Sequence, residues 1–211
     1  MEYQKYPRTP HVPWSRKTTE DDIQVSSLSS LKNKMIVVTE KMDGEGTTMY
    51  RKYIHARSID SNNHPSRDYV KAIHNAISYL IPKNMRLVGE NCFAKHSIFY
   101  DDLPGVFLGF AAFQDGICLS WKEIRKIYFE LGIHTVPVLY KGPYSEEAIK
   151  KCYTGMSKFG GVQEGYVIRN ADEFPESEFG ENVYKFVRKN HVQTDQFWMS
   201  KPIIRNKLRM I

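Results

Sequence analysis

A lysine, an aspartate and a glycine lie close together at Lys41, Asp43 and Gly44, where a β-branched stretch ends in a predicted turn. A turn at the end of a strand can hold a side chain rigidly at the mouth of a pocket. A lysine amine held there is a nucleophile once it is deprotonated, a form that burial or neighbouring cations favour. Alone, a lysine and an aspartate in a turn are usually solvated surface residues. The motif therefore needs support from other parts of the chain.

Further short motifs follow in a defined order along the chain. They contain Arg57, Glu90, Phe110, Glu164 and Lys185. The ordered series spans residues 41–189 and resembles the motifs of the covalent nucleotidyltransferases, the superfamily of polynucleotide ligases and capping enzymes. Within this superfamily it is most similar to the ATP-dependent RNA ligases of the repair and editing type. The joint order of the motifs is far more specific than any one motif.

The resemblance implies a reaction that passes through a covalent lysyl-AMP. Lys41 would attack the α-phosphate of ATP and expel pyrophosphate. The AMP would then pass to an RNA 5′-phosphate, and an RNA 3′-OH would displace it to seal the strand. The expected cofactors are ATP and Mg²⁺ or Mn²⁺, because phosphoryl transfer asks the protein mostly for positioning and charge neutralisation.

The resemblance also assigns roles to the charged residues around the nucleophile. Lys185 would stabilise the phosphate in the transition state and lower the pKa of Lys41. Glu164 would bind the metal ion. Glu90 would bind the ribose hydroxyls or order the water molecules of the metal, so both glutamates are candidate metal ligands.

Three more residues receive supporting roles from the resemblance. Arg57 would contact the ribose or the phosphate of lysyl-AMP, Phe110 would stack on adenine, and Asp43 would support the loop that carries the nucleophile. Each role has an ordinary structural alternative. Phe110 lies in an apolar stretch that is typical of a protein core, and Arg57 could form a surface ion pair with Glu90.

The last motif departs from the family at one position. Relatives carry a second lysine two residues after the first, on the same strand face, where this chain has Val187. Strand alternation predicts that Lys189 returns to the face of Lys185 if the strand persists that far, and that Arg188 points to the other face. We therefore expect Lys185 and Lys189 to supply the cations of the pocket, with Arg188 as the alternative second cation.

The elements that must position these residues include both strands and helices. The apolar periodicity predicts strands over residues 34–40, 47–54, 86–90, 106–113, 117–119, 165–169 and 182–187, and helices over 65–80, 121–131 and 146–152. Strands that occur in pairs between helices favour an α+β nucleotidyltransferase domain with largely antiparallel sheets flanked by helices, rather than a doubly wound parallel sheet.

The 211 residues are expected to form a single domain, with an extended N-terminal arm over residues 1–30, a motif-bearing core over 31–192 and a basic tail over 193–211. The arm is rich in proline, and the tail is equally consistent with RNA contacts or with a basic helix. The length leaves no room for an appended oligonucleotide-fold domain. The basic residues His64, Arg67, Lys71 and His74 mark a further candidate phosphate site, for which a solvated helix face is the more usual interpretation.

The composition limits the remaining function classes. A content of 41% hydrophobic and 26% charged residues is typical of a globular protein, and a net charge of +6 favours polyanionic partners. Three scattered cysteines argue against a zinc site or a disulfide framework. The chain contains no apolar run of membrane-spanning length and no signal-peptide core. We therefore expect a cytoplasmic protein that acts on RNA with 3′-OH and 5′-phosphate ends and has no membrane partner.

Other functions stay open at this level. A DNA ligase or a GTP-using capping enzyme would share the covalent chemistry, because these residues do not reveal the purine. A noncatalytic RNA-binding module with a decayed nucleotide site is the alternative from another class. The joint presence of Lys41, Asp43, Glu164 and Lys185 argues against such decay, since a binding module has no need of a nucleophile beside a cation.

Overall fold

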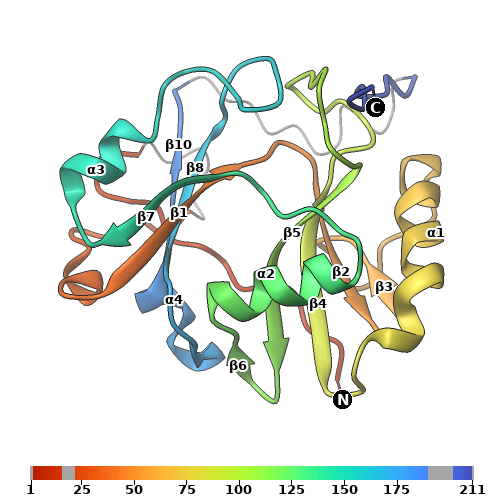
Figure 1. Cartoon of the computed structure of the whole chain (residues 1–211), viewed down its shortest axis with the longest axis horizontal. Coiled ribbons are helices and arrows are strands. Elements are labelled where there is room, and N and C mark those ends of the chain that lie inside the picture. Colours follow the sequence, from red (N-terminus) through yellow and green to blue (C-terminus); the bar gives the residue numbers. More distant parts are fainter. Residues whose placement is uncertain (1, 16–21, 190–201, 211) are drawn as a thin grey trace.

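Two antiparallel sheets form the frame of the protein (Figure 1). The computed structural model describes residues 2–15, 22–189 and 202–210. Sheet A has four strands in the order β10-β8-β1-β7, and sheet B has six strands in the order β3-β2-β4-β5-β6-β9. The strand pairings within both sheets are antiparallel. The predicted α+β class with largely antiparallel sheets is confirmed.

The strands of each sheet come from several parts of the chain. Sheet A consists of β1 (Met35–Lys41), β7 (Val138–Pro143), β8 (Gly165–Asn170) and β10 (Val183–Val187). Sheet B consists of β2 (Glu45–Tyr50), β3 (Ile54–His55), β4 (Met85–Asn91), β5 (Phe107–Gln114), β6 (Ile117–Cys118) and β9 (Phe174–Pro175). The helices are α1 (Asp68–Ile77), α2 (Trp121–Glu130), α3 (Glu146–Lys151) and α4 (Phe179–Asn182), with short 3-10 turns at Ser29–Leu31, Pro65–Arg67, Ser78–Leu80 and Glu176–Glu178.

The hydrophobic periodicity located most of these elements but missed β7. That strand pairs only with β1, at the edge of sheet A, and most of its side chains are exposed or half-buried. An edge strand without a buried face carries no alternating pattern for sequence analysis to detect. The predicted strand over 47–54 is in fact two short strands, β2 and β3, which pair antiparallel.

Helices cover both sheets and close the hydrophobic core (Figure 1). Ser120 and Glu123 form a capping box that starts α2, as Ser120 accepts from the Glu123 amide and the Glu123 carboxylate accepts in return. The buried face of α2 includes Tyr128, whose hydroxyl donates to the carbonyls of Val88 and Ala111. These carbonyls lie where the register between β4 and β5 shifts, so the helix satisfies backbone groups at the irregularity.

The two faces of sheet A have different neighbours. One face carries Ile36 and Val38, which pack in a cluster with Ile149 of α3. The opposite face carries Val37, which packs in the same cluster as Met49 and other buried residues of sheet B. Because side chains alternate along a strand, Thr39 and Lys41 point to the same face as Val37, toward sheet B.

The N-terminal segment, residues 2–15 and 22–28, extends sheet A rather than lying over the surface as an arm. Residues 10–12 pair in parallel with β10 on one side and with residues 23–25 on the other. His11 and Val12 are completely buried as a result. The expected arm is therefore extended, as predicted, but its described part contributes to the sheet edge.

The C-terminal residues 202–210 form an extended segment, so the alternative of a basic helix is wrong for this part of the tail. The segment pairs with the loop between β4 and β5, with bridges from Ala94 to Arg205 and from Leu103 to Leu208. The remainder of the predicted tail lies outside the described residues. Among the described residues, no helix is long and apolar enough to cross a membrane.

Gly165 lies at the centre of sheet A, between two other strands. The register places it opposite Lys41 on β1 and opposite Val187 on β10. A Cβ atom built on Gly165 would overlap the carbonyl oxygen of Phe186, which is a backbone atom that cannot move without shifting the strand. This position therefore requires glycine because of the close approach of β10.

Gly165→Ala is expected to lower the free energy of unfolding by about 1 to 3 kcal/mol or more, because β8 and β10 must separate to admit the methyl group. Gly46→Ala is the matched control, since a Cβ at Gly46 on β2 meets no atom within 4 Å. Its stability should stay within about 0.5 kcal/mol of the wild type. Urea unfolding of the three proteins measures the difference, and equal stability of both variants would contradict the close approach.

Candidate active site

The candidate site lies where the chain crosses from sheet A to sheet B. Strand β1 ends at Lys41 and β2 begins at Glu45, so the predicted motif forms the short connection between the sheets (Figure 1). Lys41 Nζ lies 2.7 Å from Oε1 of Glu164, and these side chains are 19% and 0% exposed. The register explains the contact, because Lys41 pairs with Gly165, the residue directly after Glu164.

The pKa of Lys41 shows that carboxylates dominate its surroundings. Burial lowers this pKa, but Glu164, Glu90 and Asp43 together raise it above the ordinary value for lysine. Lys41 and Lys185 repel each other, but the three carboxylates outweigh this repulsion at Lys41. Lys41 is held as an ammonium, and its Nζ must lose a proton before it can attack.

Asp43 anchors the loop between β4 and β5. Its Oδ2 accepts hydrogen bonds from the Ser97 amide at 2.8 Å, the Ser97 hydroxyl at 2.7 Å and the Ile98 amide at 2.6 Å. Its own amide donates to the Tyr100 hydroxyl at 2.9 Å. Asp43 thus ties the connection that carries Lys41 to the loop that starts two residues after Glu90.

Glu90 brings a second carboxylate to the site from β4. Its Oε1 accepts from the Gly44 amide at 3.1 Å. Burial, with Glu164 and Asp43 adding to it and Lys41 opposing it, raises the pKa of Glu90 to about 8. Two carboxylates that perturb each other in a largely buried place are the arrangement that a divalent cation would relieve.

The carboxylates fit a metal ion that also binds a nucleotide. The described residues contain no group of three or more His, Cys, Asp or Glu side chains that could hold a metal by themselves. Mg²⁺ commonly uses one or two protein carboxylates and takes its other ligands from substrate phosphates and water. Glu164 and Glu90 supply a donor set of that kind.

Lys185 shares the face of sheet A that carries Lys41. Lys185 pairs with Val167 and Val167 pairs with Thr39, so Lys185 lies level with Thr39, two residues before Lys41, on the face toward sheet B. Burial lowers the pKa of Lys185, and the nearby charges of Lys41 and Arg57 lower it further. Arg57 is exposed just after β3, and its charge reaches Lys185. The structure thus brings three predicted cations toward one place.

Phe110 is half-buried on β5, between two hydrophobic clusters of the core. Its ring meets the ring of Tyr6 edge to face, with centroids 5.2 Å apart. Tyr6 belongs to the N-terminal segment. The assignment of Phe110 to adenine stacking stays a prediction.

The last motif ends differently from the expectation. Strand β10 stops at Val187, and Lys189 is exposed beyond its end. The condition on which the role of Lys189 depended, a strand that persists to residue 189, is not met. The amide of Arg188 donates to the Glu164 carbonyl at 2.9 Å, and the Nε of Arg188 is buried and has no hydrogen-bond partner among the described residues. The Arg188 amide therefore continues the pairing of β10 with the residues before β8 by one residue beyond the end of the strand.

The basic side chains of the predicted phosphate site at the start of α1 form ion pairs and hydrogen bonds with other residues of the protein. A hollow of about 370 Å³ there is lined by residues of β2, β3 and α1. Arg67 in this hollow forms an ion pair with Glu45, and Lys71 donates to Asn63 at 2.6 Å. The His74 ring donates from Nε2 to a backbone carbonyl at 2.6 Å. These contacts support the structural interpretation of the basic helix start.

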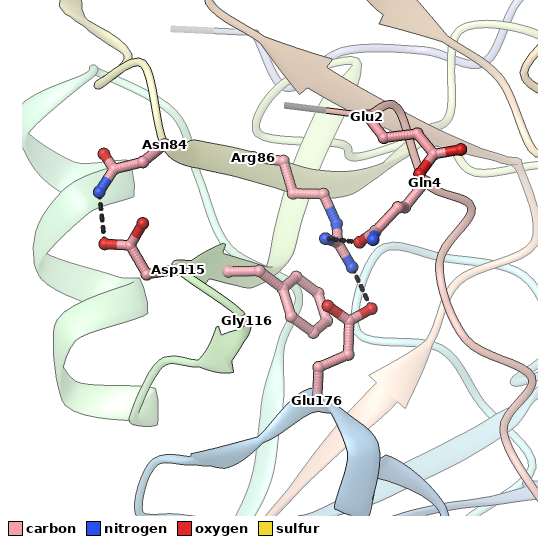
Figure 2. A pocket seen from close by; sticks show the side chains of 8 residues that line it. Glu2, Gln4, Asn84, Arg86, Asp115, Gly116 and Glu176 are labelled. Carbon is pink, nitrogen blue, oxygen red and sulfur yellow. Dashed lines mark hydrogen bonds and ion pairs between the residues drawn. The ribbon is translucent and has the colours of Figure 1, made fainter.

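A second hollow, of about 210 Å³, contains none of the motif residues (Figure 2). Figure 2 shows Arg86 of β4 between Gln4 and Glu176, with hydrogen bonds to both side chains. The Arg86 guanidinium also lies 4.1 Å from the ring centroid of Phe113. The Arg86 guanidinium therefore links the N-terminal segment and the turn after β9 to sheet B.

Comparisons with solved structures show where this fold occurs. A variant of the Naegleria gruberi RNA ligase with ATP and manganese is 19% identical and superimposes with a TM-score of 0.55, over 77% of this chain and 52% of that chain. An archaeal ATP-dependent RNA ligase is 13% identical with a TM-score of 0.56, over 88% of this chain and 48% of that one. At these identities the likeness shows the fold. The chain spans about half the length of these proteins.

The family comparison covers the site itself. The sequence model of the RNA ligase family matches residues 34–187, a range that contains every motif residue from Lys41 to Lys185. No curated protein matches the chain closely. The fold agrees with that of the RNA ligases compared and confirms the expected α+β architecture. On its sequence and its fold, this chain belongs to the RNA ligase family.

Proposed function

We propose that the protein is an ATP-dependent RNA ligase that joins RNA 3′-OH and 5′-phosphate ends through a covalent Lys41-AMP. The observation that carries this proposal is the 2.7 Å contact between Lys41 Nζ and the fully buried Glu164. It holds a lysine amine at the junction of two sheets, on the face that also bears Lys185. Family membership and the ATP in the related Naegleria structure support the choice of reaction.

The first chemical step is transfer of AMP to the protein. Lys41 Nζ loses a proton to water and attacks the α-phosphorus of ATP, so that an N–P bond forms while the bond to the leaving pyrophosphate breaks. Glu164 Oε1 fixes the direction of the amine before attack. Lys185 stabilises the negative charge that the phosphate oxygens carry in the transition state.

A divalent cation, Mg²⁺ or Mn²⁺, would neutralise phosphate charge when it is bound. Glu164 and Glu90 would hold it, since these carboxylates lie near each other and are largely removed from water. The related Naegleria protein was solved with manganese. The loop that Asp43 anchors would keep this side of the site rigid.

The second and third steps use RNA. AMP passes from Lys41 to an RNA 5′-phosphate, and an RNA 3′-OH then displaces AMP to form the phosphodiester. The net charge of +6 suits a nucleic-acid substrate. Arg57 and Arg188 are the cations near the motifs that would contact the phosphate of the adenylylated end.

The experiment that tests the proposal is incubation with ATP labelled on the α-phosphate and a divalent metal, followed by a denaturing gel. A labelled protein band establishes the covalent step. The same incubation with labelled GTP distinguishes a ligase from a capping enzyme. Sealing of a 5′-labelled RNA then establishes the complete reaction, and an enzyme that seals only DNA would contradict the RNA assignment.

Lys41→Ala is expected to abolish labelling of the protein, because it removes the proposed nucleophile. Lys41→Arg should fail as well, since a guanidinium stays protonated at accessible pH. Lys141→Ala is the control, as Lys141 is an exposed lysine on β7 of the same sheet. Undiminished labelling of Lys41→Ala would remove the central claim.

Glu164→Ala is expected to lose most ligation, and surplus Mn²⁺ should rescue little. The substitution removes both a metal ligand and the partner that directs Lys41. Glu147→Ala, at an exposed residue of α3 that pairs with Lys151, is the control. Ligation rates across a range of Mn²⁺ concentrations test this, and a wild-type rate for Glu164→Ala would make Glu164 a purely structural residue.

Lys185→Ala should slow lysyl-AMP formation by about a hundredfold or more, by loss of a cation at the transferred phosphate. Lys189→Ala should change the rate by less than about twofold, because Lys189 is exposed beyond the end of β10. Single-turnover adenylylation measures both effects. A large defect in Lys189→Ala would mean that this lysine enters the site when ATP binds.

A further inference from the structure

We infer that Asp22, oriented by His11, is a positioning residue for Lys185 in the formation of lysyl-AMP. The inference rests on the proposed function and adds to it a part of the chain that precedes all the motifs. It is carried by a continuous set of contacts that runs from the N-terminal segment to the last motif.

The backbone brings the N-terminal segment to Lys185. The Lys185 amide donates to the Pro10 carbonyl at 2.9 Å, and the Val12 amide donates to the Lys185 carbonyl at 2.9 Å. On the other side, the His11 amide donates to the Ile23 carbonyl at 2.7 Å. The resulting parallel bridge places His11 beside Lys185 on the same face of sheet A. That face also carries Lys41.

The side chains of Asp22, His11 and Lys185 also contact one another. Asp22 Oδ1 lies 3.5 Å from Lys185 Nζ and 3.3 Å from His11 Nε2. The other ring nitrogen of His11, Nδ1, lies 2.8 Å from the Ser15 hydroxyl. That hydroxyl also accepts from the Val187 amide at 3.1 Å. The N-terminal segment thus contacts both Lys185 and Val187.

The contacts of the His11 ring place it between Asp22 and Ser15. Burial, followed by the charge of Lys185, lowers the pKa of His11, so its ring is neutral at neutral pH. Nε2 faces Asp22 Oδ1 at 3.3 Å without the geometry of a hydrogen bond, whereas Nδ1 and the Ser15 hydroxyl share a hydrogen bond at 2.8 Å. The completely buried His11 therefore lies against the Asp22 carboxylate and limits where that carboxylate can move.

The charge balance explains why Lys185 needs a partner. Its side chain is 22% exposed, and burial disfavours the ammonium form that the reaction requires. Lys185 is the single lysine or arginine in β10. Asp22 compensates its charge before a nucleotide arrives and restricts the ammonium to the face of Lys41. Without Asp22, the Lys185 side chain would populate more rotamers.

The test measures the rate of lysyl-AMP formation with labelled ATP in single turnovers. Asp22→Asn should reduce the rate at saturating ATP by about ten- to a hundredfold, as expected for a misplaced catalytic group, with a smaller change in the half-saturating ATP concentration. Asp22→Glu should recover part of the rate. Glu2→Gln is the control, because Glu2 is another N-terminal carboxylate and lines the separate hollow around Arg86.

A double-mutant cycle separates positioning from a general structural role. If Asp22 acts through Lys185, Asp22→Asn should cause no further loss in a Lys185→Ala background. Equal fold-losses in both backgrounds would overturn the inference, as would a wild-type rate for Asp22→Asn alone. Urea unfolding identifies a folding defect, and if Asp22→Asn does not fold, the same cycle is measured with Asp22→Glu. A wild-type protein that forms no lysyl-AMP would contradict the proposed function itself.

Discussion

The contact between Lys41 and Glu164 is the interaction on which the rest of the site depends. A completely buried carboxylate is costly unless a cation and hydrogen bonds compensate it, and removing the partner of a buried ion pair is strongly destabilising. Here the compensating cation is the proposed nucleophile. The protein therefore holds Lys41 as an ammonium, with its Nζ directed at Glu164. The same pairing means that the arrival of a nucleotide and a metal has to redistribute charge before the amine can react.

The position of this pair is set by the crossing between the two sheets. Lys41 ends β1, Gly165 stands opposite it, and Glu45 starts β2 only a few residues later. A short crossing leaves little freedom for the residues within it. Asp43 uses its carboxylate to hold the neighbouring loop, and the Gly44 amide binds Glu90. Rigid strands thus supply the geometry, and the loop attaches to them through a buried carboxylate.

The site also extends to parts of the chain that precede and follow the motifs. Residues 10–12 extend sheet A beside Lys185, and residues 202–210 pair with the loop that Asp43 anchors. Asn206 strengthens the second contact, since its side chain donates to the Cys92 and Ala94 carbonyls and accepts from the Tyr100 amide. Both described segments therefore contact the elements that carry the proposed catalytic residues.

The sequence alone determined the α+β class, most of the strands and the ordered residues from Lys41 to Lys185, because hydrophobic periodicity and motif order are local properties of the chain. It did not show the edge strand β7, which has no buried face. Only the tertiary structure decided the charge state of Lys41, since three carboxylates from separate elements meet around it. It also decided the end of β10 before Lys189 and the contact of Asp22 with Lys185. These features depend on strand register and on pairing between distant segments, which residue spacing along the chain does not encode.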